Sequence, residues 1–288
     1  MIIVIAGATG SGKSHLAVEL AKRIDGEVIN ADAFQVYQEL SIATAKPSTT
    51  MRKEVPHHLF DFVPLTEEYN VYRYQQDLRA VLKDVIARGK TPIIAGGTGL
   101  YIRAGLFDYD FSETDHPDMS EYDALSDEQL YQKLLEIDEE SAKAIHPHNR
   151  VRVRRAIEIF LSSGRKKSEM LNEQKHEPIY PVKFFGLKPE REELYQKVEK
   201  RVDQMFEEGL VEEDTALIKK YGTSPRAFRA IGVKELFPYL EGKASLESVK
   251  DEIKKNTRHY VKRQDTFFAH QFEITWVSSI EEILSSSL

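Results

Sequence analysis

The sequence predicts an α/β protein in which helices flank a parallel β-sheet. Short apolar runs alternate with amphipathic helical patterns, and a glycine-rich turn joins the first run to the first helix. Such alternation is typical of parallel sheets with right-handed crossovers. A third observation is a polar, helix-rich stretch in the middle of the chain, which predicts an insertion into this core.

The first part of the chain, residues 1–107, contains three strand signals and two helix signals. Ile2–Ala6 is a compact apolar run, and apolar residues then recur with helical spacing over 14–24. A second strand is predicted over 27–31, a helix over 72–88 and a third strand over 92–95. These elements form the first part of the predicted core.

Residues 108–180 differ from the first part in composition and in hydrophobic pattern. Asp, Glu and Ser dominate its beginning, and helical patterns follow over 128–137 and 152–161 without a convincing strand. Residues 181–288 return to the core with a predicted strand over 182–187 and long helices over about 190–220 and 245–269. We expect Trp276, in a strand-like segment near the end, to pack in the core.

The composition is that of an ordinary globular protein. Among 288 residues there is no Cys, so neither a disulfide framework nor a Cys-based zinc site is possible. No stretch approaches the roughly 20 apolar residues of a membrane span, and the N-terminal run lacks a basic leader. We therefore expect a cytoplasmic protein, without membrane contact, that acts as a monomer.

The turn after the first strand is a P-loop. Residues 7–14 read GATGSGKS and match the spacing G-x-x-x-x-G-K-S between a strand and a helix. Backbone amides and the helix N-terminus can surround a phosphate group there, while Lys13 adds a charge and the Ser14 hydroxyl is placed to hold Mg²⁺. The predicted fold is thus a P-loop kinase-like parallel sheet. The predicted phosphate-binding residues of the loop are Gly7, Ala8, Thr9, Gly10, Ser11, Gly12, Lys13 and Ser14.

Features of a nucleotide hydrolase are missing around the loop. The third strand continues as IIAGGTGLY with no acid to organise a metal. Asp32 after the second strand and Thr98 after the third should reach the same crevice, at the carboxyl edge of the sheet. Position alone is equally compatible with a catalytic Asp32 and with a cap or turn residue, and for Thr98 it favours a turn hydroxyl.

The chain has a net charge of −7 but contains two segments rich in Lys and Arg. Residues 150–167 carry seven cations and the single acid Glu158, and residues 250–265 carry six cations against three acids. Taken alone, a charge run of this kind favours a solvated helix face. Attraction to phosphates is local at physiological salt, so such a patch could also bind RNA on an acidic protein.

Several motifs occur together in the order typical of one enzyme family. The segments are GATGSGKS, EVINADAFQVYQELSIATAKPS, VPHHLFDF, PIIAGGTGLYIRA, RAIGVKEL and TRHYVKRQDTFF. From residue 2 to about residue 270 the chain resembles tRNA dimethylallyltransferases, also called tRNA isopentenyltransferases.

The resemblance implies an activity. Such enzymes transfer the dimethylallyl group of dimethylallyl diphosphate to N6 of the adenosine adjacent, on the 3′ side, to the anticodon of tRNA, and release diphosphate. It implies that Asp32 is the base, that Thr98 contacts the reacting groups and that Arg229 lies near the diphosphate or the channel wall. The implied cofactor is Mg²⁺, held in part by Ser14, and the implied partner is the tRNA anticodon stem-loop.

The resemblance also implies RNA contacts in the crevice, in the helical insertion 108–180 and near the C-terminus. The residues are Asp32, Ala33, Phe34, Gln35, Val151, Arg152, Val153, Arg154, Arg155, Arg258, Lys262, Arg263 and Gln264. An adenine must leave the anticodon stack to reach the crevice. Three positions depart from the family pattern, which usually has Ser at Ala33, Gly at Ala43 and Tyr at Val233.

Two other enzyme functions remain as alternatives. An isopentenyltransferase acting on free adenine nucleotides would share the P-loop and Asp32 but would have less need of the basic segments. A P-loop small-molecule kinase would need the missing acid after the third strand. His57 and His58 are adjacent and have no third ligand in view, so we assign no metal to them.

Overall fold

The computed structural model describes residues 1–109 and 117–287. The chain divides into two compact units, one made of Met1–Leu106 with Tyr180–Leu288, and the other of Phe107–Ile179. No helix within the described residues is long and apolar enough to cross a membrane.

The first unit is built on a parallel sheet of six strands. The strands are β1 Ile2–Ala6, β2 Gly26–Asn30, β3 His57–His58, β4 Thr91–Ala95, β5 Val182–Gly186 and β6 Thr275–Trp276. Their order is β3-β2-β4-β1-β5-β6, and every pair is parallel. β1 and β2 are buried along their whole length, as expected for strands with helices on both faces. The predicted α/β class is confirmed.

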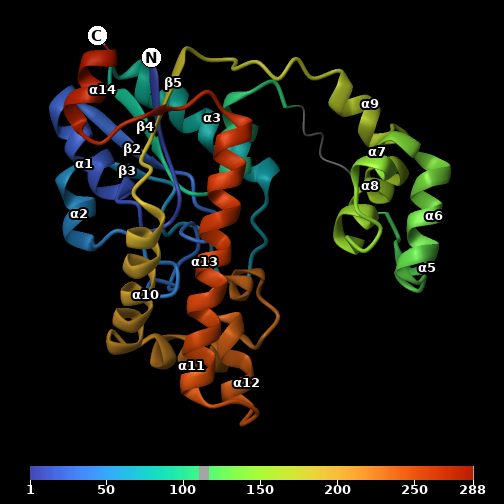
Figure 1. Ribbon diagram of the computed structural model, residues 1–288. Helices are drawn as coiled ribbons and strands as arrows, with labels where there is room; N and C mark the ends of the chain where they lie inside the picture. The colour runs from blue at the N-terminus through green and yellow to red at the C-terminus, as the bar shows by residue number, and fades with distance from the viewer. Residues whose placement is uncertain (110–116, 288) are drawn as a thin grey trace. The chain divides into compact units, whose positions relative to one another are not determined.

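Helices cover both faces of this sheet (Figure 1). They are α1 Lys13–Ile24, α2 Thr49–Glu54, α3 Val71–Ala87, α4 Gly99–Leu106 and α14 Ile280–Ser287. The apolar stripe of α1 packs with β-strand residues and with Ile283 of α14 in one core cluster. The Asn70 side chain caps α3 by accepting from the Arg73 amide, which explains why this helix begins where it does.

The C-terminal part of the first unit is helical. Its elements are α10 Arg191–Glu207, α11 Leu210–Tyr221, η1 Arg226–Arg229, η2 Lys234–Leu236, α12 Phe237–Leu240 and α13 Leu246–Gln271. The helical stretch predicted over 190–220 is two helices, because Gly209 adopts φ of +98° and ends the first one. α10 and α13 pack side by side (Figure 1).

The second unit consists of helices over its described residues. They are α5 Ser120–Asp123, α6 Asp127–Ile137, α7 Glu139–Ala144, α8 Arg150–Ser163 and α9 Lys167–Asn172. The unit has its own apolar core, which includes Leu130, Leu134 and Ile157. Buried Asp138 caps α7 and accepts hydrogen bonds from the Ser168 amide at 3.0 Å and the Ser168 hydroxyl at 2.7 Å. This carboxylate ties α9 to the rest of the unit.

The expectation that Trp276 packs in the core is wrong. Its side chain is 39% exposed. β6 is the edge strand, and Trp276 lies over Gly186 of β5, where a Cβ atom would come within 2.6 Å of the ring. The Lys188 ammonium lies 5.5 Å from the centre of the same ring. An edge position leaves the outer side of the indole open to solvent.

Candidate active site

The P-loop wraps tightly around the carboxyl end of β1. Gly7, Gly10 and Gly12 all have positive φ, which only glycine adopts without strain. Gly12 directly precedes α1, so the first amides of that helix face the loop. The Ser11 hydroxyl is buried and has no hydrogen-bond partner among the described residues. An unsatisfied hydroxyl beside free helical amides is the surrounding that a phosphate group would complete.

Lys13 is held inside the loop. Its ammonium donates to the Ala8 carbonyl at 2.6 Å, and the side chain is buried. Burial lowers the pKa of Lys13 to about 8, although the Asp32 carboxylate acts in the opposite direction. A phosphate beside this lysine would favour its charged form and raise the pKa again.

Asp32 lies just past the end of β2. One carboxylate oxygen accepts from the amides of Phe34 at 2.9 Å and Gln35 at 3.4 Å. The Asn30 side chain holds the same turn by accepting from the Asp32 amide and donating to its carbonyl. Burial raises the pKa of Asp32, and the two amides, Lys13 and Arg201 oppose that shift. The residue is therefore both a turn cap and a carboxylate of increased basicity, as a general base requires.

Thr98 joins the loops after β2 and β4. Its amide donates to the Ala31 carbonyl at 2.9 Å, and its hydroxyl accepts from the Ala33 amide at 3.0 Å. Gly96 makes this approach possible, because a Cβ atom there would lie 2.3 Å from the Ala31 carbonyl. Thr98 thus has the turn role that its position favours, and it also holds the segment that carries Asp32.

Two cavities meet at Asp32. The first has a volume of about 480 Å³ and is lined on one side by the P-loop. The second has a volume of about 220 Å³ and is lined by Phe34, Tyr260 and Arg263 among others. The residues that line both cavities are Thr9, Asp32, Ala45 and Arg201. Each cavity therefore gives a ligand access to the same carboxylate.

Arg201 is a site residue that the sequence analysis missed. It comes from α10, lines both cavities and donates to the Ala45 carbonyl at 3.0 Å. Burial lowers its pKa, and Asp32 acts in the opposite direction. The available signal was its position three residues after Val198 and directly before Val202, which are both buried. An arginine beside two core positions of a helix is directed partly inward.

Comparison with known proteins identifies the family. The family model described as IPP transferase matches residues 35–271. The chain belongs to the IPP transferase family. A relative from Anoxybacillus flavithermus, named tRNA dimethylallyltransferase, is 40% identical over 98% of this chain and 92% of its own length.

Solved structures of family members have the same fold. A tRNA isopentenylpyrophosphate transferase from Staphylococcus epidermidis is 36% identical, with a TM-score of 0.73 over 99% of this chain and 97% of that one. A eukaryotic dimethylallyltransferase described as acting on tRNA is 31% identical, with a TM-score of 0.85 over 98% of this chain and 75% of that one. The predicted family is confirmed.

In this member of the IPP transferase family, only some of the predicted P-loop residues line the first cavity. Thr9, Gly10, Gly12, Lys13 and Ser14 line the first cavity. The other three predicted residues, Gly7, Ala8 and Ser11, are not among its lining residues. Ser14 is exposed, so its hydroxyl is free to reach a ligand.

Arg229 does not lie at the P-loop. It is exposed in η1, lines the second cavity and is absent from the lining of the first. Arg229 therefore lies at the wall of the second cavity, which is one of the two locations that the resemblance implies. Gly232, three residues later, lies against Ala43 in the loop that follows Asp32.

The residues next to Asp32 divide between the two cavities. Phe34 lines the second cavity, whereas Gln35 lines the first and donates to the Thr44 carbonyl at 3.0 Å. The Ala33 amide is already bound by Thr98. Only Phe34 of the three therefore offers its side chain to a base in the second cavity.

The C-terminal cations have different environments. Lys262 and Arg263 are exposed, and Arg263 lies 5.6 Å over the ring of Tyr260. Arg258 is ion-paired with Glu199. Gln264 is buried, with its amide bound to Thr9 and Gly97, so the predicted RNA contact by Gln264 is wrong for this geometry.

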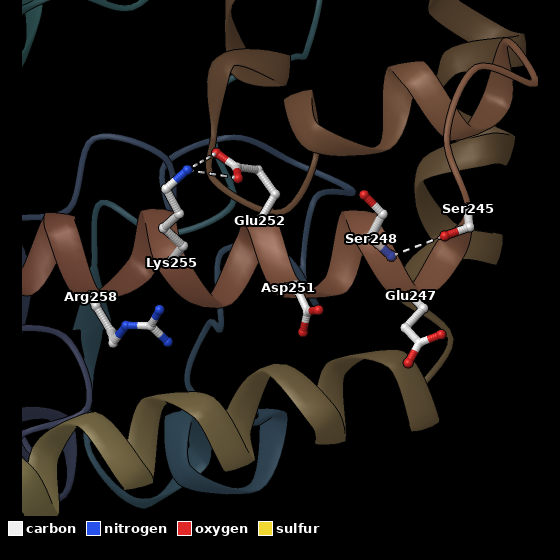
Figure 2. Close-up of a pocket in the computed structure, with 7 residues that line it drawn as sticks. All are labelled: Ser245, Glu247, Ser248, Asp251, Glu252, Lys255 and Arg258. Atoms are coloured by element: carbon white, nitrogen blue, oxygen red, sulfur yellow. Dashed lines mark hydrogen bonds and ion pairs between the residues drawn. The ribbon is translucent and has the colours of Figure 1, made fainter.

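Arg258 also borders a separate hollow along the first half of α13. This hollow, of about 570 Å³, is lined by Ser245, Glu247, Ser248, Asp251, Glu252, Lys255 and Arg258. Figure 2 shows Lys255 paired with Glu252 and the Ser245 hydroxyl bound to the Ser248 amide. This hollow has three acids and two cations, so it is a poor surface for RNA phosphates. The acidic surroundings of Arg258 therefore disfavour its predicted contact with RNA.

The predicted RNA segment of α8 is only partly accessible. Arg152 and Arg155 are exposed, and Val151 is 79% exposed. Arg154 is held by Asp123 through two hydrogen bonds of 2.6 and 3.0 Å. Val153 is fully buried in the core of the unit, so the prediction that it contacts RNA is wrong for its side chain.

Two residues that depart from the family pattern, and the two adjacent histidines, have packing or hydrogen-bonding roles. Val233 is buried, and Ala43 packs against Gly232. His58 binds Glu27 at 2.7 Å, and His57 binds the Val55 carbonyl at 2.8 Å. Among the described residues, no group of three His, Cys, Asp or Glu side chains could hold a metal ion.

Proposed function

We propose that this chain transfers the dimethylallyl group from dimethylallyl diphosphate to N6 of the adenosine that follows the anticodon of a tRNA on its 3′ side. The observation that carries the proposal is the junction of the two cavities at Asp32. One cavity presents phosphate-binding groups, and the other presents an aromatic ring and cations. The names of the relatives, tRNA dimethylallyltransferase, support the same reaction.

In this proposal the diphosphate occupies the first cavity. The P-loop amides and Lys13 bind its oxygens and stabilise the charge that grows as the carbon–oxygen bond breaks. Arg201, at the cavity junction, adds a further cation on the side of the reacting carbon. Stabilising the leaving group in this way lowers the barrier to transfer.

The adenine occupies the second cavity after leaving the anticodon stack. Phe34 and Tyr260 offer aromatic faces, and N6 would point toward Asp32. N6 forms a bond to the allylic carbon, diphosphate leaves with the bonding electrons, and the N6 proton passes to the Asp32 carboxylate. The raised pKa of Asp32 favours this last transfer.

Mg²⁺ fits the donors at the first cavity. The exposed Ser14 hydroxyl and the Asp32 carboxylate line this cavity, and hard oxygen ligands are those that Mg²⁺ prefers. Ser14 would hold the ion directly and Asp32 through water. When bound, the ion would supply further neutralisation of the diphosphate charge.

The unit Phe107–Ile179 is proposed to bind the RNA backbone, as the domain assignment 108–180 predicts. Among the described residues, no carboxylate lies within ion-pair distance of Arg152. Arg152 and Arg155 both act on Lys167, whose pKa is lowered by burial and by these two neighbours. A phosphate group would relieve this repulsion among like charges.

The test is a transfer assay with product analysis. The protein is incubated with Mg²⁺, dimethylallyl diphosphate and an unmodified tRNA that has adenosine after its anticodon, and the nucleosides are then weighed by mass spectrometry. A mass increase on that adenosine alone supports the proposal. Modification of free adenosine monophosphate but not of tRNA would favour the nucleotide alternative, and phosphoryl transfer from ATP would favour the kinase.

A further inference from the structure

Gln264 connects two loops of the site. Its side-chain oxygen accepts from the Thr9 amide at 2.8 Å, and its side-chain nitrogen donates to the Gly97 carbonyl at 2.9 Å. Thr9 belongs to the P-loop after β1, and Gly97 belongs to the turn after β4. One buried side chain of α13 therefore holds both loops at once.

The bridge is specific for an amide. A carboxylate could only accept and an ammonium could only donate, whereas glutamine does both through one planar group. Space is equally restrictive, because a Cβ atom on Gly97 would lie 2.0 Å from the Gln264 nitrogen. The chain thus matches Gln264 with a glycine on the opposite loop.

The face of α13 that carries Gln264 also reaches the second cavity. Tyr260, one helical turn earlier, lines that cavity and interacts through its hydroxyl with Thr98 and Gln264. Arg263 lines the same cavity and lies over the Tyr260 ring. Phe267, one turn later, packs against Gly99, where a Cβ atom would lie 2.3 Å from its ring. This face therefore contacts the 97–99 turn, the P-loop and the second cavity.

We propose that Gln264 is a positioning residue that couples occupation of the second cavity to the shape of the P-loop. An RNA group bound at Tyr260 and Arg263 fixes the position of this part of α13. Gln264 then fixes the P-loop and the 97–99 turn through its hydrogen bonds to the Thr9 amide and the Gly97 carbonyl. The proposal rests on the proposed function in taking the second cavity as the RNA side. Linkage then requires that RNA and diphosphate strengthen each other's binding by the same factor.

The experiment measures this factor directly. Calorimetry gives the Kd of inorganic diphosphate with Mg²⁺ for the whole protein, alone and saturated with a tRNA anticodon stem-loop. We expect RNA to tighten diphosphate binding about fivefold to tenfold in the unmodified protein, the usual size of such coupling. In Gln264→Leu we expect a factor close to one, a kcat lowered about tenfold and a KM for RNA within about twofold.

Two further variants make the outcome specific. Gln204→Leu, on an exposed position of α10, should keep the full coupling factor. Gly97→Ala should lose the coupling as Gln264→Leu does, and the double variant should lose no more than either, because both break one contact. Thermal unfolding checks that each variant is folded, and Gln264→Asn, which keeps the amide on a shorter side chain, replaces any that is not.

The two proposals fail differently. A folded Gln264→Leu that keeps the coupling factor overturns the positioning role, as does an unmodified protein without coupling. If the unmodified protein transfers no dimethylallyl group yet loses its coupling in Gln264→Leu, the proposed function fails and the positioning role stands.

Discussion

The first unit and the insertion use charged side chains in opposite ways. Lys13, Asp32 and Arg201 are brought together at two cavities, and burial is the largest influence on the pKa of each. In the insertion, Arg152 and Arg155 are exposed, and Arg154 is paired with Asp123. Buried charges are altered in reactivity, whereas exposed charges act through long-range, salt-dependent attraction. In the proposed function, the first region performs the chemistry and the second holds the RNA backbone.

Among substitutions that test this difference between the two regions, we expect the largest effect at Asp32. Asp32→Asn keeps the shape of the turn but removes the base, so single-turnover transfer should slow by about 10³-fold. RNA affinity, measured by filter binding, should change by less than about twofold. Asp203→Asn, which removes a carboxylate paired with Lys250 and Lys254, is the matched control. A large loss of RNA binding in Asp32→Asn would mean that the residue is mainly structural.

A buried charge outside the cavities should affect stability instead. Asp214 in α11 is fully buried, and both of its carboxylate oxygens lack hydrogen-bond partners among the described residues. Burial raises its pKa to about 7. The unfolded chain gives up this proton more readily, so the stability of the protein falls as pH rises from about 4 to about 7.

Asp214→Asn should remove that loss of stability. The change in the free energy of unfolding caused by the substitution should be roughly 2–4 kcal/mol more favourable at pH 8 than at pH 4. Urea unfolding at both pH values provides the measurement, with Asp251→Asn at an exposed position as the control. Equal effects of Asp214→Asn at the two pH values would show that folding does not shift the pKa of this carboxyl.

The pH dependence of diphosphate binding tests Lys13. Because the pKa of Lys13 is about 8 before the ligand binds, its charge is lost as pH rises above that value. Affinity for inorganic diphosphate should then fall by up to about tenfold per pH unit, measured by calorimetry from pH 7 to pH 10. Lys13→Gln should lack this decline and corrects for the titration of the ligand itself. Parallel curves for the two proteins would contradict the assignment.

The smallest effect is expected at the insertion. Arg152→Ala should weaken tRNA binding about fivefold at physiological salt and reduce the slope of log affinity against log salt by about 1. Lys133→Ala, an exposed cation of α6 paired with Glu136, should leave that slope unchanged. An unaltered slope in Arg152→Ala would make α8 an ordinary solvated face.

Local patterns in the sequence predicted much of this structure. The P-loop, Asp32 and Thr98 all lie at the carboxyl edge of the sheet because each directly follows a predicted strand. Arg201 and Gln264 could not be placed in this way. Their positions depend on how α10 and α13 pack against loops more than 150 residues away in sequence, as the bonds to Ala45 and Thr9 show.

Errors arose where a segment was treated as a unit. Val153 belongs to the apolar face of α8, which its helical spacing already indicated, but the contact segment 151–155 included it. The motif left two locations open for Arg229, and the tertiary packing puts it at the second cavity. Motifs identify residues that matter, and the direction of each side chain requires the tertiary packing.

The two ends of the insertion are paired with each other. Phe107 forms an antiparallel bridge with Pro178, so the unit is a long loop closed at its neck. For the chain as a polymer, doubling the length of such a loop costs only about 0.6 kcal/mol of closure entropy. The insertion could therefore be lengthened, shortened or exchanged for another module during evolution or engineering, while the register of the six strands stays the same.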